Sequence, residues 1–176
     1  APTGASALTL YVEGASATSS YYIDDIVMTY LGEEQTPPPP SLPDGLEEVT
    51  DFGNNPGNLK MFIHVPDQLA NPAPILVVSH FCGGSATAMY GGYGAPYGQA
   101  SEQHGVIIIF PQTQDPQCFD VDSNEALVRG GGSDPVSIRS MISHVQSNYT
   151  TDSNKIFATG VSSGAMMTNV LLANYP

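Results

Sequence analysis

The chain has 176 residues, of which 41% are hydrophobic and 12% are charged, enough apolar material for one folded domain and too much for a wholly disordered chain. Only 4 Lys and Arg residues oppose 17 Asp and Glu residues, and the formal net charge is −13. So few cations exclude nucleic acids and disfavour anionic membranes as partners, because both present phosphates. No apolar run approaches the roughly 20 residues that a membrane-spanning helix needs.

The first 31 residues contain two strand-like stretches, 8–12 and 21–30, separated by a small and polar segment. Two strands alone form at best a marginally stable hairpin, so we expect residues 1–31 to be the C-terminal remnant of a larger β domain. The chain begins with Ala1 and has no basic start typical of a signal peptide, so we expect a processed or partial chain.

Residues 32–45 are rich in proline, with a run at 37–40 and a further Pro43. Proline fixes φ and lacks an N–H, so this stretch favours an extended conformation and predicts a semi-rigid linker. A docking peptide for a proline-binding partner is the alternative, although no basic residue flanks the run.

Residues 46–176 form the main domain that the sequence predicts. The apolar runs 75–79 and 106–110 are unbroken, which is typical of parallel strands covered on both faces. Strands alternating with helices predict an α/β fold with right-handed crossovers. Strands are expected at 60–65, 75–79, 106–110 and 155–161. Helices are expected at 96–104, ended by Gly105, and at 164–174. A further helix is expected to begin from an N-cap at Asp134, with Pro135 in its first position.

The pentapeptide 160–164, Gly-Val-Ser-Ser-Gly, matches the nucleophile elbow G-x-S-x-G. A tight strand-to-helix turn exposes the Ser162 hydroxyl, and glycines flank it because a Cβ would clash there. The same turn places the backbone N–H of Ser163 at a helix N-terminus, where it can stabilise an oxyanion. The pattern alone arises by chance in roughly one such chain in six, but a buried strand at 156–159 and a helix at 165–172 supply the required context. A glycine-rich turn with two surface serines is the alternative.

A second element follows the strand at 75–79, where residues 80–84 read His-Phe-Cys-Gly-Gly. In α/β-hydrolases the loop after this strand provides the second oxyanion N–H and often carries an HGGG-like sequence. The backbone N–H of Cys82 is the expected donor, and His80 is expected to be structural. An ordinary glycine-rich turn is the alternative.

The other histidines do not fit a catalytic role. His64 lies in an early strand, His104 ends a helix, and His144 lies on an apolar helix. In α/β-hydrolases the catalytic residues occur along the chain in the order Ser, acid, His. Residues 164–176, which follow the elbow, contain neither an acid nor a histidine. We therefore expect the acid and the histidine of a triad to be missing from this chain.

Cys82 and Cys118 are the two cysteines of the chain. They have no CxxC spacing, so no zinc is expected, and no other metal or cofactor is predicted. In a chain with a secreted character the pair predicts a disulfide, which would stabilise the fold by about 4 kcal/mol and pin the oxyanion loop. Two unpaired buried thiols are the alternative. Residues 148–150 form an N-glycosylation sequon, which matters only in a eukaryotic source.

Residues 46–176 closely resemble the fungal-type acetyl xylan and feruloyl esterases of carbohydrate esterase family 1, which are related to polyhydroxybutyrate depolymerase-like esterases. The resemblance rests on the segments 49–56, 80–82, 118–121, 130–134 and, above all, 160–170. It implies an α/β-hydrolase fold truncated after the elbow helix, with Ser162 as the nucleophile. It also implies that the backbone N–H groups of Cys82 and Ser163 form the oxyanion hole.

Residues 1–31 resemble, more weakly, the last strands of xylan-binding β-sandwich modules related to families 22, 4 and 9. The segments 10–13 and 22–26 carry this resemblance. Such modules often hold a structural calcium ion near the final strand, so Asp24 or Asp25 is a candidate ligand. Two solvated acids are the alternative.

The function expected from these observations is a secreted serine esterase that removes acetyl groups from xylan through an acyl-enzyme on Ser162. A feruloyl esterase of the same family is one alternative. The other is a non-catalytic carbohydrate-binding protein with a degenerate esterase-like domain. The expected partner is xylan or a related plant cell-wall polysaccharide.

Overall fold

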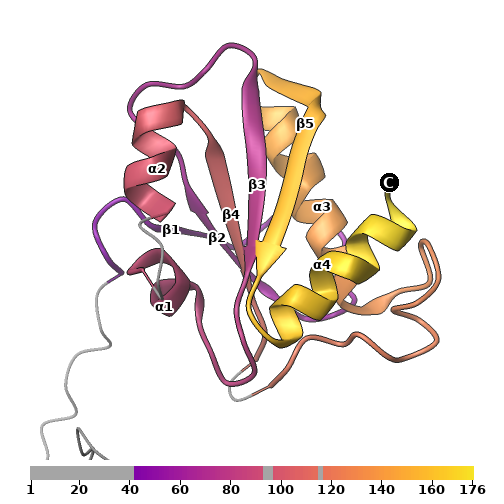
Figure 1. Cartoon of the computed structure of the whole chain (residues 1–176). Helices are drawn as coiled ribbons and strands as arrows, with labels where there is room; N and C mark the ends of the chain where they lie inside the picture. Colours follow the sequence, from indigo (N-terminus) through magenta and orange to yellow (C-terminus); the bar gives the residue numbers. More distant parts are fainter. Residues whose placement is uncertain (1–41, 93–96, 115–116) are drawn as a thin grey trace, which may run out of the picture. The chain divides into compact units, whose positions relative to one another are not determined.

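The computed structural model describes residues 42–92, 97–114 and 117–176 (Figure 1). The chain divides into two compact units, Ala1–Pro38 and Pro39–Pro176, and only the second contains described residues. The expected β remnant at 1–31, its candidate calcium ligands Asp24 and Asp25, and most of the 32–45 linker lie outside the described residues.

The described part of the second unit is built around one mixed sheet with the strand order β1-β2-β4-β3-β5. β3 is parallel to both β4 and β5, whereas β2 is antiparallel to both β1 and β4. The strands are β1 (Glu47–Val49), β2 (Lys60–His64), β3 (Ala73–Ser79), β4 (Ile107–Gln112) and β5 (Thr151–Gly160).

The parallel pairing predicted from the two unbroken apolar runs is confirmed. Ile75 of β3 pairs with Ile107 of β4, and Val77 pairs with Ile109. All four of these side chains are at most 1% exposed, because helices cover both faces of the sheet here. The antiparallel direction of β2 is a feature that strand–helix alternation did not indicate.

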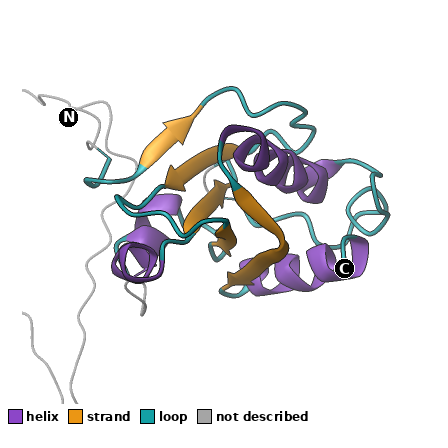
Figure 2. Ribbon diagram, turned by 90° about the horizontal axis from the view of Figure 1, so that it is seen from above, coloured by secondary structure: helices purple, strands orange, loops and turns teal. Residues whose placement is uncertain are grey.

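The helices form two layers, one on each face of the sheet (Figure 2). On one face α3 (Ser133–Asn148) and α4 (Ser163–Asn174) pack on alternate strand residues such as Ile75 and Val77. On the other face α1 (Ala86–Tyr90) packs on the intervening residues such as Val78 and Phe110, beside α2 (Tyr97–His104). This alternation is the period of two that a strand imposes on its side chains.

The strand before the elbow differs from the prediction in its burial. β5 exists, but it is an edge strand of the described sheet, and Phe157 is 54% exposed. Phe157 pairs with Leu76, so it points to the face that carries α1 and α2. Ile156 and Ala158 point to the opposite face and are half-buried. The expectation of a buried strand at 156–159 is therefore wrong.

Two helix boundaries test the capping predictions. α2 ends at His104, and Gly105 follows with φ of 65° and donates to Ser101 O at 2.8 Å, as predicted. The predicted cap of the following helix is wrong. α3 begins at Ser133 after an N-cap at Gly132, and Asp134 lies inside the first turn with its carboxylate turned to another segment.

Candidate active site

The Ser162 elbow has the strand–turn–helix geometry that its motif requires. β5 ends at Gly160 and α4 begins at Ser163, so Ser162 occupies the turn between them. Ser162 has φ of 52° and ψ of −117°, a conformation that residues with a side chain rarely adopt. Its side chain is exposed. The turn therefore holds a serine hydroxyl away from the sheet in a strained backbone, a feature that clusters at functional sites.

The two glycines of the elbow are required by close backbone contacts. A Cβ on Gly164 would lie 2.2 Å from Ser79 O, and one on Gly160 would lie 2.4 Å from the carbonyl carbon of Gly164. Both distances are far below van der Waals contact, and both neighbours are backbone atoms that cannot rotate away. The prediction that no Cβ fits beside the serine is confirmed.

The elbow lies against the start of the second predicted element, the oxyanion loop (residues 80–84). Ser79, the last residue of β3, pairs with Gly160, the last residue of β5. The N–H of Val161 donates to Ser79 O at 3.2 Å. Because β3 and β5 are parallel, their carboxyl ends meet at one edge of the sheet, and the elbow and the oxyanion loop both leave from that edge.

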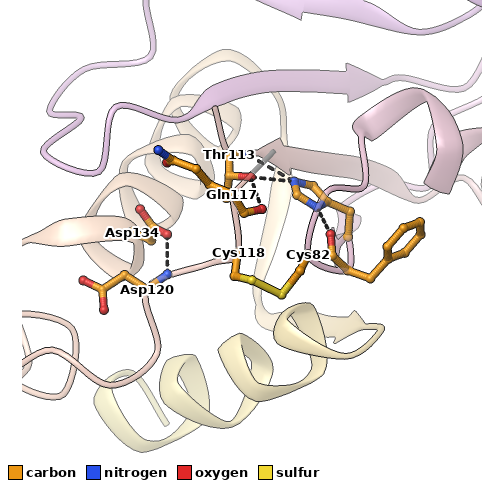
Figure 3. The surroundings of a disulfide bond; sticks show 8 residues. Cys82, Thr113, Gln117, Cys118, Asp120 and Asp134 are labelled. Atoms are coloured by element: carbon orange, nitrogen blue, oxygen red, sulfur yellow. Dashed lines mark hydrogen bonds between the residues drawn. A yellow bond between two sulfur atoms is a disulfide. The ribbon is translucent and has the colours of Figure 1, made fainter. Parts of the chain in front are cut away.

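A disulfide joins the oxyanion loop to a segment distant in sequence. Cys82 and Cys118 are bonded, at a sequence separation of 36, which confirms the predicted pairing (Figure 3). Beside the disulfide, the N–H of Gly83 donates to Gln117 O at 3.2 Å. The loop is thus attached by one covalent bond and one hydrogen bond to the chain that follows β4.

His80 is buried inside this loop and holds a single tautomer. The backbone N–H of Thr113 donates to its Nε2 at 3.1 Å, so Nε2 must be the unprotonated nitrogen. Nδ1 then carries the proton and donates to Phe81 O at 2.6 Å. Burial lowers the pKa of His80 below its ordinary value, which keeps the ring neutral. Both ring nitrogens are occupied, as the predicted structural role requires.

The two predicted oxyanion donors have no competing acceptor. Ser163 is the first residue of α4, and Cys82 lies at the exposed tip of the loop. Within the described ranges no acceptor is found for the backbone N–H of either residue. Free N–H groups at a helix N-terminus and in a neighbouring loop are the arrangement that stabilises developing negative charge on oxygen.

Two buried hydroxyls near the elbow were not singled out by the sequence. The Oγ atoms of Ser79 and Ser163 are buried and have no hydrogen-bond partner in the described part of the chain. Unsatisfied buried hydroxyls cost free energy and are uncommon in folded proteins. No sequence signal distinguishes them, because a serine in a strand or a helix carries no sign of its partner.

Asp134 and Asp120 are further ordered polar residues, for which the sequence predicted only a helix cap at Asp134. The Asp134 carboxylate accepts a hydrogen bond from the backbone N–H of Asp120 at 2.7 Å (Figure 3). Burial raises the pKa of Asp134 to about 6, against the lowering effect of that hydrogen bond. The Asp120 carboxylate accepts bonds from Ser123 and from the Ser133 hydroxyl. These contacts order the chain that follows Cys118. The segment 130–134 carries part of the family resemblance and includes Asp134, but it did not indicate these contacts.

The other histidines are placed away from a nucleophile–base arrangement. His144 is half-buried on α3, and His104 is exposed at the end of α2. His64 ends β2, with Nδ1 2.7 Å from Gly45 O and Nε2 3.2 Å from a Glu102 carboxylate oxygen. None of the three has a described contact with Ser162.

A large cavity in the described chain is not the candidate active site. It has a volume of about 740 Å³ and is lined by residues such as His64, Tyr90 and Glu102. His64 pairs with Ile108, near the amino end of β4, so this cavity lies toward the sheet edge opposite the elbow. No residue of the elbow or of the oxyanion loop lines it. We assign the site from the elbow geometry because a cavity without a nucleophile has no acyl-transfer chemistry.

Among the described residues no group of three or more His, Cys, Asp and Glu residues is arranged to hold a metal ion. None of the helices in the described ranges is both long and apolar enough to cross a membrane.

Curated proteins similar to this chain are fungal esterases. No family model matches the chain. Acetylxylan esterase A of Aspergillus oryzae is 48% identical over 132 residues, which are 74% of this chain and 42% of that protein. Feruloyl esterase B of Talaromyces funiculosus is 48% identical over 139 residues, 78% of this chain and 39% of that protein. The chain therefore spans about two fifths of the length of the relatives that it matches.

Solved structures similar to this one show how the elements are arranged. An acetyl xylan esterase from Aspergillus awamori superposes with a TM-score of 0.70 and 46% identity, covering 74% of this chain and 47% of that one. A thermostable esterase, at 18% identity and a TM-score of 0.58, shares the fold alone. The mixed sheet, the elbow at the end of β5 and these likenesses together identify the described domain as part of an α/β-hydrolase fold, similar over most of its length to fungal acetylxylan and feruloyl esterases.

Proposed function

We propose that this chain is part of a secreted serine carboxylesterase of carbohydrate esterase family 1 that removes acetyl groups from xylan. The observation that carries the proposal is the exposed Ser162 at a positive φ between β5 and α4, followed by the free N–H of Ser163, at the sheet edge from which the loop of Cys82 also leaves. The similarity to acetylxylan esterases supports the substrate class. The disulfide supports secretion, because disulfides persist in oxidising compartments.

In the proposed reaction Ser162 Oγ attacks the carbonyl carbon of the ester while a base removes the hydroxyl proton. The carbonyl oxygen becomes an oxyanion and accepts hydrogen bonds from the N–H groups of Cys82 and Ser163. The C–O bond to the sugar then breaks, and the sugar oxygen takes the proton and leaves as an alcohol. Water next attacks the acyl-enzyme, which releases acetate and restores the Ser162 hydroxyl.

The base and its orienting acid are proposed to come from outside the described chain. Residues 164–176 contain no acid and no histidine. His64 and His80 are engaged elsewhere, and neither His104 nor His144 has a described contact with Ser162. An apolar groove of about 280 Å³ runs between α3, β5 and α4, and its lining includes the exposed Phe157 and Leu172. We propose that the remainder of an esterase domain packs on this open edge and brings the missing acid and histidine to Ser162.

Two finer assignments belong to the same proposal. Residues 1–31 are proposed to be the end of a xylan-binding β-sandwich module, joined through the 32–45 linker. Feruloyl ester hydrolysis is the second candidate activity, favoured by relatives named feruloyl esterase at the same 48% identity. The two esterase activities share the nucleophile and the oxyanion hole and differ only in the pocket that receives the acyl group.

The test is carried out on the native protein, whose intact mass is compared with the 18.5 kDa of these 176 residues. Wild-type protein is expected to release acetate from acetylated xylan and to be labelled by a fluorophosphonate on Ser162. The S162A variant is expected to lose at least about 10⁴-fold in kcat while its thermal unfolding stays close to wild type. Ser147→Ala, an exposed serine on α3, is the matched control.

Each arm of this test has an outcome that counts against the proposal. Turnover retained in S162A would remove Ser162 as the nucleophile. Ferulate release without acetate release would favour the second activity. A native mass of 18.5 kDa without labelling would replace the esterase with a carbohydrate-binding protein, which pull-down on insoluble xylan would then detect.

A further inference from the structure

We propose that His80 is a positioning residue that aims the backbone N–H of Cys82 at the oxyanion. The proposal rests on the proposed ester hydrolysis and adds to it a residue whose side chain never touches the substrate. Its evidence is a set of hydrogen bonds within the oxyanion loop.

The first step concerns the peptide between Phe81 and Cys82. This peptide is trans, because the cis bond in the described chain is the one before Pro72. In a planar trans peptide the carbonyl oxygen and the amide hydrogen point in opposite directions. Any contact that fixes the direction of Phe81 O therefore also fixes the direction of the Cys82 N–H.

The second step is that donors hold Phe81 O from inside the loop. His80 Nδ1 lies 2.6 Å from this oxygen, and the N–H of Gly84 donates to it at 2.8 Å. The Gly84 contact closes a turn in which Gly83 has φ of 71°, a conformation that glycine adopts without strain. With the carbonyl held by the buried ring, the Cys82 N–H faces away from the ring, on the exposed side of the loop.

The third step is that the ring itself cannot turn. Thr113 donates its backbone N–H to Nε2, and the His80 ring packs 4.7 Å, centroid to centroid, from the Phe119 ring. The Thr113 hydroxyl donates in turn to Gln117 O, one residue before the disulfide. A protonated ring, or the other neutral tautomer, would place an N–H donor at Nε2 against the Thr113 N–H. The site therefore selects the neutral tautomer whose Nδ1–H holds Phe81 O.

Two substitutions separate positioning from simple packing. In H80N the side-chain amide lies where Nδ1 was, so it keeps a donor for Phe81 O and loses the contact with Thr113. In H80Q the amide reaches the former Nε2 position, so it keeps the contact with Thr113 and loses the donor for Phe81 O. His104→Gln, at an exposed helix end, is the control.

If His80 positions the oxyanion donor, H80Q loses about 10²-fold in kcat for ester hydrolysis with KM little changed, the effect of a lost oxyanion-hole donor. H80N then stays within about tenfold of wild type. If the ring only fills space, both variants lose activity in proportion to their loss of thermal stability. Equal kcat losses in H80N and H80Q would overturn the proposal.

A measurement on the amide itself keeps this test separate from the proposed activity. The amide proton of Cys82 is followed by NMR before and after phosphonate labelling of Ser162, since the phosphoryl oxygen takes the place of the oxyanion. The signal is expected to shift downfield in wild type, H80N and H104Q, and not in H80Q. If wild type is not labelled, the proposed function fails. The chemical shift of the Cys82 amide proton in the unlabelled protein then tests the positioning role of His80. Among the variants H80Q alone should change this chemical shift, and an unchanged shift in H80Q would overturn the proposal.

Discussion

The elbow and the oxyanion loop leave the same edge of the sheet, yet their backbones are held in different ways. The elbow (160–164) is held by steric exclusion, with glycines pressed against β3 and a strained Ser162 between them. The oxyanion loop (80–84) is held by cross-links, namely the Cys82–Cys118 disulfide and the His80 hydrogen bonds. Close contacts that permit one backbone path hold the elbow, whereas the oxyanion loop is held by bonds to segments distant in sequence.

Removing the disulfide should have the largest effect on stability, and it acts on the loop alone. The double variant C82S/C118S should lower the free energy of unfolding by up to about 4 kcal/mol, because the unfolded chain regains the entropy of a 36-residue separation. Urea denaturation measures the change, and reduction of wild type with dithiothreitol should reproduce it, since the chain has no other cysteine. An unchanged unfolding midpoint would show that the loop is held by its hydrogen bonds alone.

Adding a methyl group at Gly164 should destabilise the elbow, because steric exclusion holds its backbone in place. G164A places a Cβ 2.2 Å from Ser79 O and 2.6 Å from His80 O, so the backbone must move, at a cost of about 3 kcal/mol. The matched control G83A, in the oxyanion loop, has φ of 71° and no atom within 4 Å of the new Cβ, so it should cost about 1 kcal/mol. Thermal unfolding of the two variants measures the difference. Equal losses would contradict steric control of the elbow.

Relieving the strain at Ser162, the proposed nucleophile, should stabilise the fold while abolishing the proposed chemistry. S162G removes the side chain that disfavours φ of 52°, which stabilises the folded state. This gain in folding free energy should outweigh the added conformational freedom of the unfolded chain by about 1 kcal/mol. S162A keeps the Cβ and should show no gain. Differential scanning calorimetry of both variants checks this prediction. A less stable S162G would mean that the elbow stores no strain.

The last expected effect is a pH dependence that originates beside the disulfide. Burial raises the pKa of Asp134 from 3.8 to about 6, so the folded state binds more protons than the unfolded state between these values. This contribution to stability is present below about pH 4 and is lost as the pH rises to about 6. D134N keeps an acceptor for the Asp120 N–H without titrating, so its stability relative to wild type should increase over that range. Urea denaturation of both proteins at several pH values tests the sign of this change in stability. Parallel plots of unfolding free energy against pH for the two proteins would contradict the prediction.

Local sequence was sufficient to predict the elements whose conformation has a local cause. The Gly-x-Ser-x-Gly run predicted the elbow, because a glycine requirement on both sides of a serine leaves few other backbone paths. Gly105 predicted the end of α2 for a similar reason, since its φ of 65° suits glycine. The unbroken runs in β3 and β4 predicted parallel pairing through their burial on both faces.

The predictions that failed depend on what another segment does. Asp134 has the residue type of a helix cap, but its carboxylate accepts the Asp120 N–H, so Gly132 takes the cap position. Phe157 belongs to an apolar strand, but it is exposed because nothing in the described chain covers that side of β5. Burial and hydrogen-bond partners are properties of pairs of segments, and a single stretch of sequence does not contain them.

The sequence by itself predicted the α/β class of the domain, the position of the elbow serine and the pairing of its two cysteines, since each follows from residue identities at short spacing or from the presence of one cysteine pair. Only the tertiary structure decided the direction of β2, the open edge at β5 and the tautomer of His80. These features arise when strands and loops far apart in the chain meet, and the partner that fixes the His80 ring, Thr113, lies 33 residues away.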